Sequence, residues 1–396
     1  MPSSPDILWI VTTQWRAQAI GYAGAVNART PSLDALADGS VNYTQAVTPH
    51  PFGPFARAAM LTGVLSPENG VRDYFDPLPV TSRTIAHRFG ERGYETAFFG
   101  KWHLWKRDPA AALVGEAHAR IVVPPEARGG FDFWEGVESG FQLNDPWLHG
   151  SRLSEPSRFS GYQPDVLCSR VATWLSKQNP NAKIQTPKAS DRRPWFCMVS
   201  LETPHPPYDA PAAGVMGGDP AKFHLAANVP RGGEVEAKAR RELAGYYAHI
   251  EATDRAIGRL LNAAGKEVLV IFTSVHGDMH GAHGLFRKGW PYEESVRVPL
   301  LVRLPGGSAR ACDEAVSLVD LPRLVEGFVD SGRWPKIETE FAAISMPSVV
   351  RLPLQCERIW QGRRSKTRKQ IFNEDGSLWL DFDLANDPDE IINRAY

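Results

Sequence analysis

Four short polar segments could carry chemistry, because each follows an apolar run typical of a buried strand. They are Thr13-Gln14, Lys101-Trp-His103, Pro204-His205 and Val275-His276. Lysine supplies a positive charge for an anion, and the near-neutral pKa of histidine suits proton transfer. These segments are therefore the first candidates for a functional site.

The apolar runs indicate why these segments should meet. The runs cover 7–12, 96–99, 195–201 and 268–273, and they are rich in β-branched and aromatic residues. Such runs are typical of strands buried on both faces of a parallel sheet. Amphipathic stretches at 31–38, 82–92, 165–177 and 236–264 predict helices between the strands, on both sides of the sheet. Functional loops of such sheets gather at the carboxyl ends of the strands.

The remaining segments suggest two units. Residues 1–310 are predicted to form the catalytic-type domain. Within it, segment 105–161 is rich in Pro, Gly, Trp and His. We interpret this segment either as a loop-rich insertion over the pocket or as an irregular surface insertion. Residues 311–396 are predicted to form a small C-terminal subdomain, with a helix at 313–330 and short strands with a turn at 374–376 within 358–382.

Composition excludes several classes of protein. The 396 residues carry 44 Lys+Arg and 45 Asp+Glu, a formal net charge of −1, with no basic stripe, which argues against binding nucleic acid through its phosphates. No apolar run is long enough to span a membrane, and the N-terminal segment has no signal-peptide pattern, so we expect a cytoplasmic protein without a membrane partner. The four cysteines are far apart, so neither a zinc ribbon nor a disulfide framework is expected. The oligomeric state is not predicted.

Eight fragments along the chain resemble the type I sulfatases of the alkaline phosphatase superfamily, in that family's order. They are ILWIVTTQWRAQAIGYAG at 7–24, TPSLDALA at 30–37, RAAMLTG at 57–63, GYETAFFGKWHL at 93–104, GYQPDVL at 161–167, TPHPPY at 203–208, FTSVHGDMHGAHGLFRKGWPYEESVRVPLLVRLPG at 272–306 and DFDLANDPDE at 381–390. The resemblance implies an α/β/α sandwich with a mostly parallel central sheet and a small C-terminal α+β subdomain.

The resemblance also implies roles for particular residues. In that family a formylglycine made from Cys or Ser is the nucleophile, carboxylates hold a divalent cation, and Arg, Lys and His surround the sulfuryl or phosphoryl group. Carried over by motif, Arg57 matches the Arg after the nucleophile, Lys101 and His103 match the GKWH pair, His205 matches the histidine near the leaving group, and Lys288 matches the late lysine on the anion. A further match is His276, at the family's Asn/His position beside the metal aspartate.

The departures from the family pattern concern the nucleophile and the metal. Thr13 and Gln14 stand where the family has its first metal ligands, so Thr13 replaces a carboxylate. Gly53 stands where the convertible Cys or Ser should be, and Val275 replaces another metal carboxylate. Glycine cannot become formylglycine, and hard cations need several oxygen ligands. We therefore expect no metal and no cofactor.

A charge count sharpens this expectation. Losing the carboxylates at 13 and 275 together with a dication leaves the local charge unchanged, so Arg57, Lys101 and Lys288 still attract an anion. The predicted catalytic residues are His103, His205, Lys101 and Lys288. The predicted substrate-binding residues are Arg57, Lys101, Lys288, His276, Thr13 and Gln14.

Other readings of these residues stay open. The cations could be ordinary surface charges, His103 and His205 could be core histidines, and His276 could pack against the pocket wall. The string His276, Asp278, His280 and His283 could be a rebuilt transition-metal site, and Thr12, Thr13 or Thr48 could replace the nucleophile. The aromatic residues Trp134, Trp147, His149 and Tyr162 could line the substrate side of the pocket or hold their loops in place.

Three hypotheses for function follow. The first is a sulfatase-like enzyme independent of metal and formylglycine, which acts on a small anionic substrate (sulfate, phosphate, phosphonate or carboxylate) by His/Lys acid–base chemistry. The second is a noncatalytic protein that binds an anionic ligand or a partner. The third is a hydrolase of sulfate or phosphate esters with a rebuilt metal site.

Overall fold

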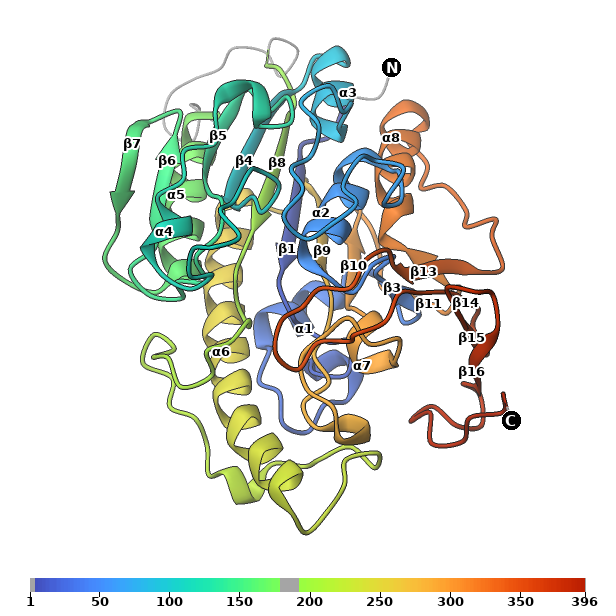
Figure 1. Cartoon of the computed structure of the whole chain (residues 1–396). Coiled ribbons are helices and arrows are strands. Elements are labelled where there is room, and N and C mark those ends of the chain that lie inside the picture. Colours follow the sequence, from blue (N-terminus) through green and yellow to red (C-terminus); the bar gives the residue numbers. More distant parts are fainter. Residues whose placement is uncertain (1–3, 179–191, 396) are drawn as a thin grey trace.

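A computed structural model gives the fold and describes residues 4–178 and 192–395. Its centre is a ten-stranded sheet whose strand order is β11-β2-β10-β9-β1-β8-β4-β5-β6-β7 (Figure 1). Neighbours in the middle of the sheet run parallel: β9 (Leu269–Ser274), β1 (Ile7–Thr12), β8 (Trp195–Ser200), β4 (Glu95–Lys101) and β5 (Phe133–Val137). Every residue of β1, β8 and β9 is buried, as expected for strands covered on both faces.

The edges of this sheet contain antiparallel strands. On one side lie β10 (Leu300–Arg303), β2 (Val41–Tyr43) and β11 (Arg310–Cys312), and on the other lie β6 (Trp147–Gly150) and β7 (Leu153–Arg158). β10 pairs antiparallel with β9 and with β2, and β6 pairs antiparallel with both its neighbours. The central sheet is therefore mostly parallel, which confirms the predicted fold class.

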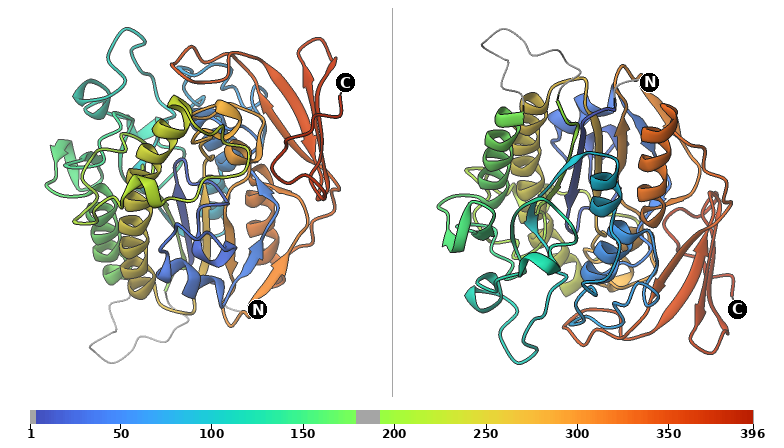
Figure 2. Two further views of the ribbon diagram at one scale, coloured as in Figure 1. Left: turned by 90° about the horizontal axis from the view of Figure 1, so that it is seen from below. Right: turned by 90° about the horizontal axis from the view of Figure 1, so that it is seen from above.

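Helices cover both faces of the sheet (Figure 2). One face carries α1 (Pro31–Ala37), α5 (Gln163–Gln178) and the long α6 (Glu234–Ala264), and the other carries α2 (Gly53–Thr62), α3 (Ile85–Glu91) and α8 (Leu321–Ser331). Alternate residues of one strand enter different cores: Trp9 packs with the second group of helices, and Leu8 and Ile10 pack with the first. The crossover helices predicted from periodicity are thus confirmed in place and to within a few residues.

A small antiparallel sheet lies beside the α2 and α8 face and contains β13 (Ala342–Met346), β14 (Trp360–Arg364), β15 (Arg368–Asn373) and β16 (Leu378–Asp383). The turn predicted at 374–376 joins β15 to β16. The helix predicted at 313–330 is too long: its first part is β12 (Val316–Ser317), which pairs with β3 (Ala46–Val47), and a 3-10 turn before α8. β11 joins the large sheet, and residues from both predicted units pack into one apolar core. The structure therefore does not separate two units at residue 310, and this domain boundary stays a prediction.

Segment 105–161 is less irregular than its composition suggests. It contains β5, β6 and β7, which extend the large sheet, and the short helix α4 (Glu116–Ala119). Trp134 is fully buried on β5, so tryptophan in this segment serves the core as well as the surface.

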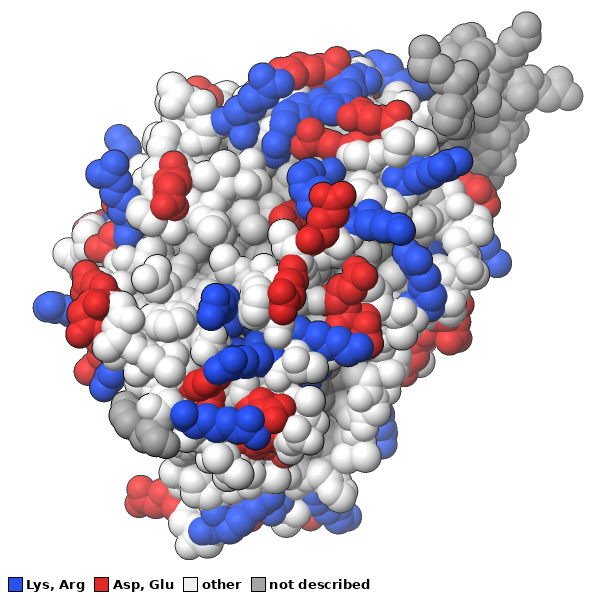
Figure 3. All heavy atoms as spheres, turned by 90° about the vertical axis from the view of Figure 1, so that its right-hand side faces the viewer, with Lys and Arg blue, Asp and Glu red and all other residues white. Residues whose placement is uncertain are grey.

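The surface and the helices match the composition. Figure 3 shows Lys/Arg and Asp/Glu interspersed over the face that carries the small sheet, without a field of one sign. None of the described helices has both the length and the apolar character needed to cross a membrane.

Candidate anion site

The predicted site residues meet at the carboxyl ends of the parallel strands, on one cavity of about 1040 Å³. Thr13 follows β1, Lys101 ends β4, and His205 and His276 follow β8 and β9. The cavity is lined by six of the eight predicted residues: Thr13, Lys101, His103, His205, His276 and Lys288. The other two, Arg57 and Gln14, do not line it but hold residues that do. Their direct contact with a substrate stays a prediction.

Arg57 lies behind the cavity floor on α2 and is 2% exposed. Its guanidinium donates to the Thr13 hydroxyl at 2.9 Å, to the Ser200 hydroxyl at 2.5 Å and to the Lys101 carbonyl at 3.2 Å. None of these partners is charged. Burial lowers the Arg57 pKa to about 10, so the side chain stays protonated and leaves a positive charge under the site.

Lys101 is paired with a carboxylate that the sequence analysis did not single out. Its Nζ donates to Glu202 Oε1 at 2.8 Å, and the ammonium lies 4.0 Å from the centre of the Phe141 ring. Burial lowers the Lys101 pKa to about 8, although Glu202 opposes the shift. Glu202 comes two residues after β8, so its place after a strand end was an available signal. No motif or strand end pointed to Phe141.

Lys288 has only neutral hydrogen-bond partners. Its Nζ donates to Gln14 Oε1 at 2.8 Å and lies 3.3 Å from His205 Nε2. Burial lowers its pKa to about 7. This ammonium therefore exchanges its proton near neutral pH, in contact with a histidine.

The tautomers of two cavity histidines follow from their backbone contacts. Nδ1 of His205 lies 2.8 Å from the Pro206 carbonyl, and Nδ1 of His276 lies 2.9 Å from the Gly277 carbonyl, so each Nδ1–H donates to an acceptor. Each Nε2 is then the nitrogen that can accept a proton. For His276 this atom is buried and has no partner in the part of the chain that the structure describes, whereas for His205 it faces Lys288.

Within residues 4–178 and 192–395, neither ring nitrogen of His103 has a hydrogen-bond partner, although the side chain is only 3% exposed. It lies edge-on to the Tyr74 ring and opposite Gly53 at the start of α2. Burial and nearby cations lower the pKa of His103 well below its usual range, and burial and Lys288 do the same for His205. Both histidines are consequently neutral in the free site and can accept protons or hydrogen bonds from a ligand or water.

A buried polar cluster fixes Gln14 behind the floor. The Gln14 amide donates to Asp278 Oδ2 and to the Tyr208 hydroxyl, and Tyr208 itself donates to Asp278 Oδ2 at 2.6 Å. Although burial favours its neutral form, His280 and Arg287 hold the Asp278 pKa well below its usual range. Asp278 is thus a carboxylate that orients the amide, and Gln14 in turn orients Lys288.

The residues present do not fit a formylglycine or the divalent cation of related sites. Gly53 has no side chain, and a Cβ there would lie 2.8 Å from His103 Nδ1. Val275 offers no ligand and is fully buried. The Thr13 hydroxyl already accepts from a guanidinium, and Gln14 Oε1 accepts from an ammonium. A dication needs several oxygen ligands, so the charges beside these oxygens oppose it.

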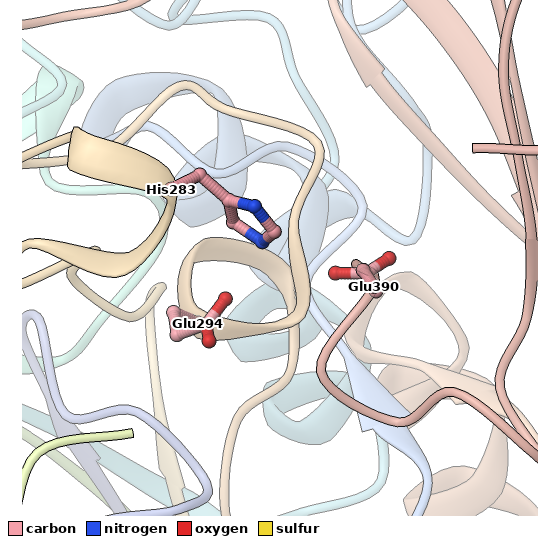
Figure 4. Close-up of side chains that lie close together, drawn as sticks. All are labelled: His283, Glu294 and Glu390. Carbon is pink, nitrogen blue, oxygen red and sulfur yellow. The ribbon is translucent and has the colours of Figure 1, made fainter. Parts of the chain in front are cut away.

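The string of residues 276–283 does not gather into the rebuilt metal site considered above. Within the described parts of the chain, the one group of three candidate ligands is His283, Glu294 and Glu390, which point toward one another in Figure 4. They come from the loop after β9, from α7 (Glu293–Val296) and from the segment after β16. An amide already lies among them, because Asn228 Nδ2 is 3.1 Å from His283 Nε2 and 2.8 Å from Glu294 Oε1. Glu390 pairs with Lys369 at 2.5 Å. This group links the C-terminal segment to the large unit.

The aromatic residues considered for the substrate side do not line the cavity. Trp134 is core, His149 accepts from the Val123 amide, and the Tyr162 hydroxyl contacts His249 at 2.8 Å. Trp147 is half-buried on β6 and is also absent from the lining. They hold their segments in place, the second of the two readings.

Comparison with known proteins places this geometry in a family. The family model described as Sulfatase matches residues 5–325. The chain belongs to the sulfatase family. It is 37% identical over 316 residues to an ulvan-active sulfatase of Formosa agariphila, covering 77% of this chain but only 57% of that relative's length. It is 27% identical to an arylsulfatase of Clostridium perfringens, covering 98% of this chain and 90% of the relative.

A solved structure agrees with the fold of this sulfatase-family chain. YidJ of Bacteroides fragilis superposes with a TM-score of 0.84 at 23% identity, covering 99% of this chain and 91% of that one. The agreement confirms the predicted fold, including the small C-terminal sheet.

Proposed function

We propose that this sulfatase-family chain binds the anionic group of a small sulfate or phosphate ester on Lys101 and Lys288, and hydrolyses the ester without formylglycine or a divalent metal. One observation carries the proposal: among the described residues, neither Arg57 nor Lys288 has a carboxylate oxygen within 4.0 Å. A buried cation without a counterion is costly, and an anionic ligand supplies the counterion.

The site also offers the groups that hydrolysis needs. His276 lines the cavity, and its Nε2 is buried without a hydrogen-bond partner among the described residues. In the proposed reaction this nitrogen takes a proton from a water molecule as the water oxygen bonds to sulfur or phosphorus. The bond to the ester oxygen breaks, and Lys288 gives the departing oxygen a proton, which His205 helps to deliver. Lys101 and the charge of Arg57 stabilise the equatorial oxygens. A sulfate ester gives an alcohol, sulfate and one proton, and a phosphate monoester gives an alcohol and hydrogen phosphate. The proton taken up by His276 restores the one that Lys288 gave away.

The relatives support hydrolysis of sulfate esters, because both carry sulfatase names. One feature favours a noncatalytic alternative: Gly53 gives the site no side-chain nucleophile, so an anion could bind without turnover. In that case the same cations would form a sensor site.

The experiment uses chelator-treated protein whose metal content has been measured. Binding of inorganic sulfate is followed by calorimetry, and release of sulfate or phosphate is followed over a panel of monoesters. We expect binding and slow turnover, and His205→Asn should lower turnover by a larger factor than it weakens sulfate binding. The matched control is His224→Asn, an exposed histidine outside the cavity, which should change neither.

Three results separate the hypotheses. Absence of any anion binding would overturn the proposal. Binding without turnover of any ester favours the sensor, and turnover that returns only with a stoichiometric divalent ion favours a rebuilt metal site.

A further inference from the structure

The outer part of the cavity has a different chemistry from its charged floor. Its walls contain Leu113, Val114, Ala212, Val215 and Met216. These residues come from the segment before α4 and from the loop between β8 and α6. Among the described residues that line the cavity there is no Trp, Asn or Ser. The walls therefore offer contact area and few hydrogen-bond partners.

Most of the polar groups in the outer part are already engaged. Arg287 donates to both carboxylate oxygens of Glu242 at 2.7 and 2.9 Å. The Gln355 side-chain oxygen accepts from the Lys288 amide. The remaining charged lining residues of this part, Asp209 and Arg241, are exposed and so remain hydrated.

Two of the wall residues are apolar and strongly exposed. Met216 is 87% exposed and Val114 is 64% exposed, and they belong to separate segments that meet the same cavity. Single exposed apolar residues are ordinary, but several around one cavity mark a binding surface. The unbranched thioether side chain of methionine adapts readily to ligands of different shape.

We propose that the ester bound here carries an apolar aryl or alkyl group on its bridging oxygen, and that this group lies along the Leu113–Val114 and Ala212–Met216 walls. The inference rests on the proposed function for the anionic end of the ligand. A sugar in the same place would lose water from its hydroxyls without gaining partners, and unpaired buried polar groups are costly. An apolar group gains affinity from the same desolvation.

The test compares sulfate esters that share one anion. Calorimetry with phenyl sulfate, ethyl, butyl and hexyl sulfate, and glucose 6-sulfate isolates the contribution of the organic part, with inorganic sulfate as the reference. We expect phenyl and hexyl sulfate to bind at least about 10-fold more tightly than glucose 6-sulfate, and each added CH₂ to strengthen binding by up to about fourfold. Equal or tighter binding of glucose 6-sulfate would overturn the inference.

Variants connect any preference to these walls. In the double variant Val114→Ser, Met216→Ser the ratio of hexyl sulfate affinity to inorganic sulfate affinity should fall about 3- to 10-fold. Val26→Ser is the matched control, because Val26 is 75% exposed and lies outside the cavity lining. An unchanged ratio in the double variant would contradict the placement.

A further ligand keeps the two proposals distinguishable. If inorganic sulfate fails to bind, the proposed function is wrong, and hexanol then tests the apolar walls alone. Saturable hexanol binding that weakens in the double variant supports the inference, and its absence overturns it.

Discussion

Replacing Lys288 by methionine should stabilise the free protein at acidic pH while weakening anion binding. The pKa of Lys288 falls from 10.5 to about 7 because the ammonium is buried, and among the described residues no carboxylate pairs with it directly to offset this. The unfolded chain therefore binds more protons than the folded chain between about pH 7 and 10.5, so the free energy of unfolding rises with pH in that window.

The size of the effect follows from the shift. At about 1.4 kcal/mol per pKa unit, holding Lys288 charged in the folded state costs about 5 kcal/mol below pH 7. Methionine removes this cost but leaves Gln14 Oε1 without its donor, a loss of about 1–3 kcal/mol. The net gain at pH 6 is about 2–4 kcal/mol. For a chain of 396 residues this raises Tm by a few degrees, because 1 kcal/mol shifts Tm by about 1 °C at this length.

Anion binding should change in the opposite direction. A hydrogen bond to a charged group contributes about 1.5–3 kcal/mol, so at pH 6 the variant should bind inorganic sulfate about 10- to 150-fold more weakly. The affinity of the wild-type protein should fall as pH rises through about 7, where Lys288 loses its charge, and that step should be absent from the variant.

The assay is thermal unfolding from pH 5.5 to 9, with and without sulfate, combined with calorimetry. Lys266→Met is the control, because Lys266 is exposed and lies outside the cavity lining. A Lys288→Met protein that is less stable than the wild type at pH 6 and binds sulfate equally well would refute the reasoning, since Lys288 would then be an ordinary structural lysine.

Three further predictions concern the same site. Glu202→Gln leaves Lys101 without its carboxylate, so it should destabilise the free protein by about 3–5 kcal/mol in unfolding experiments. The same change should strengthen sulfate binding measured by calorimetry, and weaker sulfate binding would contradict the prediction. Gly53→Ala places a methyl group 2.8 Å from His103 Nδ1 and should lower the free energy of unfolding by about 1–3 kcal/mol. The control is Gly90→Ala on α3, which has open space around its Cβ and should leave the protein equally or more stable. Calcium or magnesium at millimolar concentration should leave Tm within about 1 °C of chelator-treated protein, and a large saturable rise would show that the metal site survives.

Much of the fold could be predicted because buried strands and long amphipathic helices have strong local patterns. β1, β8, β9 and α6 lie within a few residues of their predicted bounds for that reason. Strands β2 and β11, at one end of the sheet, have only three residues each, so their pairing depends on distant segments and leaves no periodicity to read. The same holds for β5 to β7, where a composition rich in Trp, Gly and Pro conceals an extension of the sheet.

The site was predictable where residues follow strand ends and unpredictable where they come from loops. Lys101 and His205 follow β4 and β8, whose parallel register brings their carboxyl ends together. Phe141 belongs to no strand or motif, yet it stacks on the His205 ring at 4.5 Å and lies under the Lys101 ammonium. Such a contact depends on the path of a loop, and local sequence does not determine that path.

Thr13 and Gln14, which stand where the sequence resemblance places metal ligands, take part in the hydrogen bonds that hold Arg57 and Lys288. The Thr13 hydroxyl accepts from Arg57 and donates to the Leu201 carbonyl, so a carboxylate is not needed to hold the guanidinium. Gln14 has no carboxylate at position 13 or 275 beside it, and its oxygen accepts from the Lys288 ammonium. An aspartate at position 13 alone would pair with Arg57, neutralise its charge and so weaken the anion site. A metal site at these residues would need carboxylates at both 13 and 275, and the first of them alone removes the positive charge on which anion binding depends.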